Sequence, residues 1–262
     1  MRRRSVLVAL LACGCGRLWF ESSDPDARTT DSTDSLPADS PIASAVAIWT
    51  FDEGTGTIAN DASGRGHSMT LNNGVGWTTG VSNAAVTADG IDDYGIVDTL
   101  DLSGTASVTI SILVNRTYTN GPNHTLVELT NDTNLATTGL GIFPDNTTNC
   151  TGQGRILLFV VGDNAYSGNC YAQPTSGVWH HLVAVFDKTR SGTQETQLYI
   201  DGVAQATTSA PWNKDNTNMF GAHPLYVFAR NGVPETMSAS IDELIVWDRA
   251  LTPAEIVALP GP

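Results

Sequence analysis

The chain has 262 residues, of which 41% are hydrophobic and only 15% charged, and its formal net charge is −14. A protein of that charge repels polyanions, which excludes nucleic acid as a partner and leaves neutral glycans, basic proteins and divalent cations open. The length suits one large β-sandwich that buries its own core.

The first residues are typical of an export leader. Three arginines at positions 2–4 precede the apolar run Val6–Leu11, which is too short to span a bilayer and indicates a signal peptide over residues 1–12. The run ends in Leu-Leu-Ala-Cys, which resembles the bacterial lipobox, so we expect Cys13 to be lipidated. The lipid would then be the chain's only membrane attachment, at the outer membrane or cell surface. The alternatives are an ordinary signal peptide cleaved nearby and a lipobox ending at Cys15.

Residues 13–43 follow as a linker. Between residues 20 and 43 there are six acidic side chains against Arg28 alone, with three prolines and many serines and threonines. Such a segment has too little apolar surface to fold, and its like charges extend it. We expect a disordered acidic tether between the lipid and a domain over residues 44–262.

The domain is predicted to be all-β, with one short helix at its C-terminal end. Asp201-Gly202 lies between two alternating runs and predicts a two-residue hairpin. Thr252-Pro-Ala-Glu255 is a capping box with proline at the first helical position. The predicted strands are Ala45–Phe51, Met69–Leu71, Ala84–Ala88, Tyr94–Val97, Ser107–Val114, Thr125–Leu129, Gly139–Phe143, Arg155–Val161, Trp179–Phe186, Gln197–Ile200, Val203–Thr207, Leu225–Ala229 and Ser240–Trp247.

Six short segments resemble, in order, those of the bacterial laminin-G-like family. The resemblance implies a concanavalin A-like jelly-roll β-sandwich, and it is weakest at Gly95 and across residues 117–154. The segments are IWTFDEGTG (48–56), NDASGRGH (60–67), ADGIDDY (88–94), VWHHLVAVFD (178–187), LYIDGV (198–203) and IDELIVWDRALT (241–252).

The tryptophans divide into two groups. Trp49, Trp179 and Trp247, with Phe51, fall on predicted strands and are expected to fill the core. Trp77 and Trp212 lie in predicted loops beside glycine or proline, where an exposed indole face would stack on a sugar ring. The alternative for both is a loop tryptophan that folds back over the core edge.

A structural calcium ion is predicted at one edge of the sandwich. Asp52 ends the first strand, Asp61 lies in the glycine-rich loop after it, and Asp242 begins the last long strand. Carboxylates and loop carbonyls give the oxygen-only coordination that Ca²⁺ accepts, and the family resemblance implies such a site here. The alternative is that these aspartates cap turns. The five histidines show no zinc-binding pattern.

Two cysteines remain in the body of the chain, Cys150 and Cys170. An oxidising, exported compartment favours a disulfide between them that joins two neighbouring loops, with two free thiols as the alternative.

The resemblance implies a non-catalytic module that binds a glycan or a cell-surface protein. No glutamate is followed two residues later by aspartate, so the Glu-x-Asp-x-x-Glu motif of β-glucanases with this fold is absent, and no other catalytic motif is found. We therefore assign no catalytic residue. A glycosidase or lyase without a recognisable motif, and a purely structural surface protein, are the alternatives.

Overall fold

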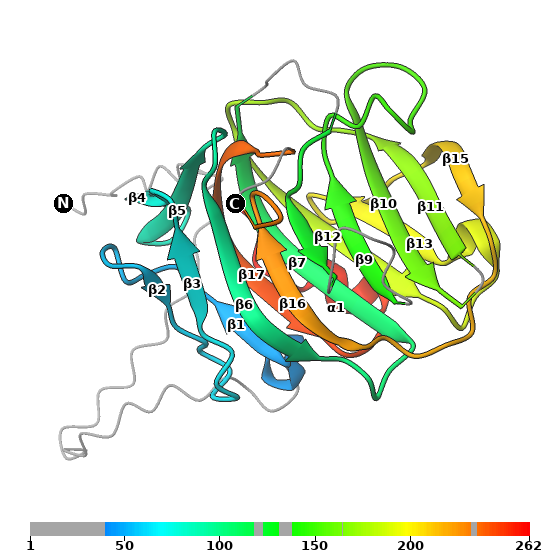
Figure 1. Cartoon of the computed structure of the whole chain (residues 1–262), viewed down its shortest axis with the longest axis horizontal. Helices are drawn as coiled ribbons and strands as arrows, with labels where there is room; N and C mark the ends of the chain where they lie inside the picture. The colour runs from blue at the N-terminus through cyan, green and yellow to red at the C-terminus, as the bar shows by residue number, and fades with distance from the viewer. Residues whose placement is uncertain (1–39, 118–122, 131–137, 164, 232–234) are drawn as a thin grey trace, which may run out of the picture. The chain divides into compact units, whose positions relative to one another are not determined.

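The computed structural model describes residues 40–117, 123–130, 138–163, 165–231 and 235–262. These residues form two antiparallel sheets that pack face to face, which confirms the predicted all-β sandwich (Figure 1). The signal peptide, Cys13, Cys15 and most of the predicted linker lie outside the described residues. None of the described helices is long and apolar enough to cross a membrane.

One sheet has eight strands. Its central strands β7, β12 and β17 are long and pair along most of their length. From edge to edge its strands are β14 (Val203–Ala204), β13 (Thr196–Ile200), β12 (Trp179–Asp187), β7 (Ser107–Arg116), β17 (Ser238–Trp247), β5 (Ala84–Asp89) and β4 (Gly76–Thr79), and β1 (Ala47–Trp49) also pairs with β17.

The other sheet has nine strands. From edge to edge its strands are β15 (Thr207–Asn213), β11 (Ala165–Ala172), β10 (Arg155–Gly162), β9 (Gly139–Phe143), β8 (Val127–Leu129), β16 (Ala222–Val227), β6 (Tyr94–Asp101), β3 (Met69–Asn72) and β2 (Ile58–Ala59).

The main hydrophobic core lies between the two sheets. Alternate residues of most strands point into it, as the two-residue period of a strand requires. Trp49 and Phe51 belong to this core, as predicted, and both are fully buried. Trp179 differs from the prediction because it begins β12 and is half-buried.

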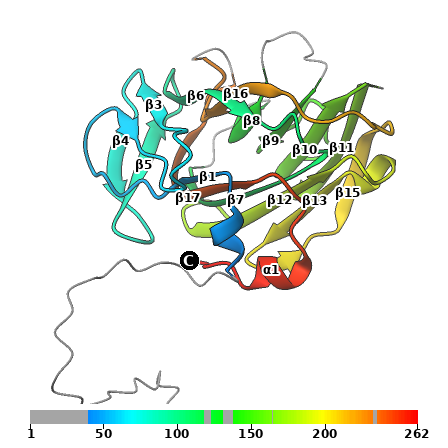
Figure 2. The same cartoon turned by 90° about the horizontal axis from the view of Figure 1, so that it is seen from below.

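A second apolar cluster covers the outer face of the eight-stranded sheet. Trp247 lies in this cluster and not between the sheets, and its Nε1 donates to the carbonyl of Pro41 at 2.7 Å. The covering elements are the 3₁₀ turn η1 (Pro41–Ser44) and the helix α1 (Pro253–Val257). Figure 2 shows α1 on the far side of the eight-stranded sheet from the nine-stranded one. Residues 40–43, predicted as the end of a free linker, are therefore part of the packed domain because Ile42 packs on this cluster.

The local predictions at the two turn motifs are confirmed. Asp201 and Gly202 both have positive φ, 51° and 78°, and join β13 to β14. Thr252 and Glu255 form the predicted capping box at the start of α1. The sequence missed β11, whose residues include Gly168 and Asn169 and lack β-branched side chains. A second 3₁₀ turn, η2, spans Gly192–Gln194.

Candidate functional site: an aromatic pocket on the nine-stranded sheet

Aromatic side chains gather on the outer face of the nine-stranded sheet, away from the main core. Leu158 and Val160 of β10 point into the core, so Phe159 between them points outward. Phe159 is 5.2 Å from Phe143, 6.0 Å from Tyr166 and 6.4 Å from Trp212, between ring centres. We call Phe143, Phe159, Tyr166 and Trp212 the outer aromatic cluster.

Two glycines allow these rings to lie against the sheet. Phe159 pairs with Gly141 of β9 on one side and with Gly168 of β11 on the other, and Gly168 pairs with Trp212 of β15. A Cβ at position 141 would lie 2.7 Å from Phe159 Cε1, and one at 168 would lie 3.2 Å from Trp212 Cε3. The rings therefore occupy space that glycine leaves free, and together they form a broad apolar floor.

The disulfide fastens a loop beside this floor. Cys150 and Cys170 are bonded, which confirms the predicted pairing, although Cys170 lies within β11 and not in a loop. The bridge packs with Leu157 and Phe143 in an apolar cluster separate from the main core. It therefore ties the loop between β9 and β10 to the sheet.

The floor and its neighbouring loops enclose a pocket of about 250 Å³. Phe159, Tyr166 and Trp212 line it from the sheet, and Asn149 lines it from the disulfide-linked loop. Polar groups from Asn123, Arg230 and Glu235 complete the lining. Planar polar side chains beside aromatic faces bind ligands that have both an apolar face and hydrogen-bonding groups.

Arg230 is held by a carboxylate of the sheet. Its Nε donates to Glu128 Oε2 at 2.8 Å, and its Nη2 donates to Oε1. Glu128 is almost fully buried, with 2% of its side chain exposed, whereas 21% of Arg230 is exposed. Burial raises the pKa of Glu128 and the guanidinium opposes that shift; for Arg230 the carboxylate outweighs burial and raises the pKa. The geometry is that of a two-point ion pair.

The other polar contacts in the pocket are looser. Asn123 Nδ2 donates to Glu235 Oε1 at 3.5 Å, and no described group donates to its buried Oδ1. The hydrogen bonds of Arg230 to Glu128 use Nε and Nη2, and Nη1 takes part in neither. The pocket lining thus supplies a donor group in Arg230 and an acceptor group in the carboxylate of Glu235.

The two tryptophans predicted to bind a ligand lie in different places. Trp212 belongs to the outer aromatic cluster and lines the pocket, on an edge strand and not in a loop. Trp77 lies on β4, packs against the rim of the main core and donates from Nε1 to the carbonyl of Gly56 at 2.9 Å. The structure therefore places one of the two at the candidate site.

The three aspartates predicted to bind calcium are not gathered together. Asp61 accepts from the backbone N–H groups of Ile48, Ser63 and His67 and from the Ser63 hydroxyl. Burial would raise the pKa of Asp61, but these hydrogen bonds outweigh it and lower the pKa. With its four acceptor positions engaged, Asp61 acts as a turn cap, the alternative considered from the sequence.

Asp52 and Asp242 do act on the same turn, residues 80–84. Asp242 is fully buried, accepts from the N–H groups of Val81 and Ser82, and lies at a bulge in β17 where Glu243 has a φ of 49°. Asp52 accepts from the N–H of Ala84. Burial, then the charges of Asp242 and Asp52, raise the pKa of Glu243 to about 7. The charges of Asp52 and Asp242 therefore act on Glu243, although these three residues do not form a group with oxygens within 4.8 Å of one another among the described residues.

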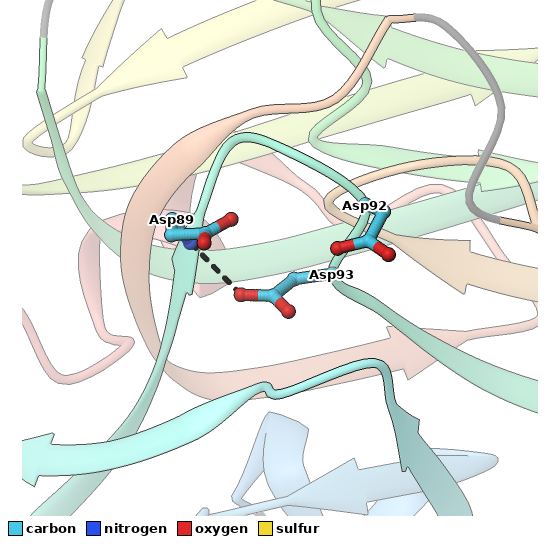
Figure 3. A group of neighbouring side chains, drawn as sticks. All are labelled: Asp89, Asp92 and Asp93. Carbon is cyan, nitrogen blue, oxygen red and sulfur yellow. Dashed lines mark hydrogen bonds between the residues drawn. The ribbon is translucent and has the colours of Figure 1, made fainter.

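A different set of aspartates is the tightest acidic group among the described residues. Carboxylate oxygens of Asp89, Asp92 and Asp93 lie within 4.8 Å of one another at the turn between β5 and β6 (Figure 3). Asp93 accepts from the N–H of Asp89 at 2.9 Å, and Asp89 accepts from the N–H of Ile91 at 2.8 Å. These hydrogen bonds stabilise the turn.

Most of the pocket was not assigned from the sequence. A local signal was present in Arg155–Val161, where both faces of the strand are apolar, so Leu157 and Phe159 need a cover of their own. The Glu128–Arg230 pair gave no local signal because the two residues are 102 positions apart.

The fold and the pocket define a β-sandwich with a ligand-sized recess on one outer face. Residues 89–257 match the concanavalin A-like lectin/glucanases superfamily, and the chain belongs to that family. A comparison with curated protein sequences finds no match.

Solved structures share the fold at low sequence identity. Domain 4 of AbnA, an extracellular arabinanase from Geobacillus stearothermophilus solved with arabinotriose, aligns with a TM-score of 0.62 and 15% identity over 82% of this chain and 97% of that domain. The binding domain of botulinum neurotoxin serotype G gives 0.61 and 14%, and Trypanosoma rangeli sialidase gives 0.59 and 13%, each over 82% of this chain. The chain spans half of that binding domain and about a third of the sialidase chain.

Proposed function

We propose that the protein is a non-catalytic glycan-binding module and that the aromatic pocket is its binding site. The observation that carries this proposal is the pairing of an aromatic floor with planar polar side chains around one pocket. A sugar ring has one apolar face of C–H groups and a rim of hydroxyls, so it matches both parts of the lining. The relative solved with arabinotriose supports this class of ligand.

The pocket is small for a long oligosaccharide. Its volume of about 250 Å³ is below the roughly 300–1,000 Å³ typical of drug-sized ligand sites. It therefore accommodates one or two sugar rings, with the rest of the glycan outside.

We assign no turnover to the pocket, and the engagement of the buried carboxylate beside it supports this assignment. Both oxygens of Glu128 accept from Arg230, so this group is not free to act as a nucleophile or a general acid. Incubation of the protein with polysaccharides, followed by measurement of new reducing ends and unsaturated products, tests this point. Product above the level of a protein-free control would favour the enzyme alternative.

The pocket and the start of the described domain lie on opposite outer faces of the sandwich. η1, where the predicted linker enters the domain, packs on the outer face of the eight-stranded sheet, and the pocket lies on the outer face of the nine-stranded sheet.

The test of binding is a glycan array probed with the multivalent protein, with the two tryptophans as a matched pair. Trp212→Ala removes a ring from the pocket and should weaken binding at least about tenfold, or about 1.4 kcal/mol. Trp77→Ala should leave affinity unchanged because Trp77 contacts the core rim. Absence of binding at high avidity would favour a purely structural role, and equal losses in both variants would place the site elsewhere.

A further inference from the structure

Acidic side chains outnumber basic ones at the pocket and directly behind it. Arg230 is the one basic side chain among its described lining residues, and Glu235 is the acidic one. Behind Arg230 lies the buried carboxylate of Glu128, which neutralises it. The pocket and its immediate support therefore carry one negative charge in excess.

This arrangement opposes an acidic ligand. A sugar carboxylate or sulfate that reached Arg230 would have to compete with a two-point ion pair already formed to Glu128, and it would lie near Glu235. The wider field acts in the same direction, because residues 40–262 hold 21 acidic and eight basic side chains. An uncharged ring meets neither obstacle.

The ion pair also fixes the guanidinium in place. With Nε and Nη2 bound to Glu128, the Arg230 plane stays beside the pocket and keeps Nη1 as a donor for a neutral hydroxyl. Glu128 is thus placed to orient Arg230 as well as to cancel its charge.

We propose that Glu128 is a selectivity residue: by pairing with Arg230 it restricts the pocket to uncharged sugars and excludes uronates and sulfated sugars. This inference rests on the proposed glycan-binding function of the same pocket. Glu128 contacts the arginine and not the ligand, so it acts through the charge and position of Arg230.

The experiment compares matched glycans on the full chain. An array presents each hexose beside its uronate and its 6-sulfate, and dissociation constants of the best matched pair are then measured by calorimetry. The wild type should bind the neutral member at least tenfold more tightly than the acidic members. In Glu128→Gln, Arg230 keeps a hydrogen-bond partner but regains its charge, so the neutral-to-acidic ratio should fall at least tenfold.

Asp101→Asn provides the matched control. It removes one negative charge from an exposed residue at the end of β6, outside the pocket lining, and should leave the ratio unchanged. An equal change in Asp101→Asn and Glu128→Gln would overturn the role of Glu128 in favour of the overall field.

A second measurement needs no variant, and it applies even if Glu128→Gln fails to fold. Salt screens repulsion between charges, so raising NaCl from 0.05 to 0.5 M should tighten wild-type binding of the acidic glycans and leave the neutral ones unchanged. Wild-type binding of uronates as tight as that of neutral sugars, or weakened by salt, would overturn the inference. Failure to bind any glycan would instead overturn the proposed function.

Discussion

Phe159 lies directly across the β9–β10 ladder from Gly141, and its ring fills the space that a side chain at position 141 would need. Phe143 lies two residues after Gly141 on β9, and the ring of Phe143 also covers the space beside Gly141. The apolar floor of the pocket therefore depends on a residue that contributes no atoms to it.

Gly141→Ala should damage the floor. The new Cβ would lie 2.7 Å from Phe159 Cε1, so the rings must tilt away from the sheet. Such overpacking typically costs about 1–3 kcal/mol of stability, and glycan affinity should fall with it. Thermal melting and calorimetry measure the two effects. Gly104→Ala is the matched control because nothing lies within 4 Å of its new Cβ; normal glycan affinity in Gly141→Ala would contradict the importance of the floor.

Removal of the disulfide should cost stability and binding together. The bridge closes a loop of 20 residues, which corresponds to about 3 kcal/mol in the chain-entropy view. Cys150→Ser/Cys170→Ser should therefore unfold at lower denaturant, and its glycan affinity should fall because the loop that carries Asn149 is released. Non-reducing peptide mapping of the exported protein should show the linked peptides; two freely alkylated thiols would refute the bridge.

The two tryptophans show why the sequence located the site only in part. Pro211 precedes Trp212 and indicated a loop, since proline removes a backbone donor from a sheet. β15 is an edge strand, however, and one side of an edge strand needs no donor. β4, which carries Trp77, is likewise at a sheet edge. The neighbouring glycine or proline therefore identified both tryptophans as candidates, but the order of the strands in the sheets determines which one lines the pocket.

The contrast between Asp61 and Glu243 has a similar origin. Asp61 follows the first strand of the sandwich, and Glu243 lies within β17, the last strand. The sequence favoured Asp61 because it lies in a glycine-rich loop. A bulge in β17 shifts the register after Asp242, and the charges of Asp242 and Asp52 act on Glu243. Alternation along an ideal strand does not reveal a bulge, whereas the core strands and the capping box followed their local patterns and were predicted correctly.

Cys13→Ser should release the protein from membranes if the lipobox prediction is right. The acyl chains would anchor the protein, and without them the exported chain should move from the detergent phase to the aqueous phase in a Triton X-114 partition. Cys15→Ser is the matched control and should partition like the wild type. Retention of the Cys13→Ser protein in the detergent phase would contradict the prediction, and release by Cys15→Ser would place the lipid two residues later.

A calcium ion bound by Asp52 and Asp242, two of the three ligands predicted from the sequence, should stabilise the fold, and the charges of both carboxylates also act on Glu243. None of the ion pairs between described residues involves these three carboxylates, so a divalent cation would offset their repulsion. A ligand at a hundredfold excess over its Kd adds about 2.7 kcal/mol. The melting temperature should rise with Ca²⁺ and fall with EDTA, and Asp52→Asn should abolish the response. Asp61→Asn should lower the melting temperature equally with and without Ca²⁺; a wild-type curve indifferent to both additions would rule out the site.

The stability of the protein should rise as the solution becomes alkaline, because the buried Lys188 then loses its charge. It is 3% exposed, its Nζ donates to Asn218 Oδ1 at 3.0 Å and lies 4.2 Å from the centre of the Phe220 ring. Burial lowers the pKa of Lys188 to about 8, although the charges of Glu195 and Asp163 oppose this shift. Between pH 8 and the ordinary lysine pKa of 10.5, the unfolded chain binds more protons than the folded chain. Stability therefore rises with pH in that window, by up to about 3 kcal/mol.

Chemical unfolding at pH 8, 9 and 10 in the wild type and in Lys188→Met isolates this contribution. The methionine variant has no charge to bury, so its stability relative to the wild type should be greatest at pH 8 and decline as the pH rises. Lys214→Met, which removes an exposed lysine, controls for the change in net charge and should show no such trend. A constant difference between Lys188→Met and the wild type across the three pH values would show that Lys188 is protonated in the folded protein throughout, held by the carboxylates of Glu195 and Asp163.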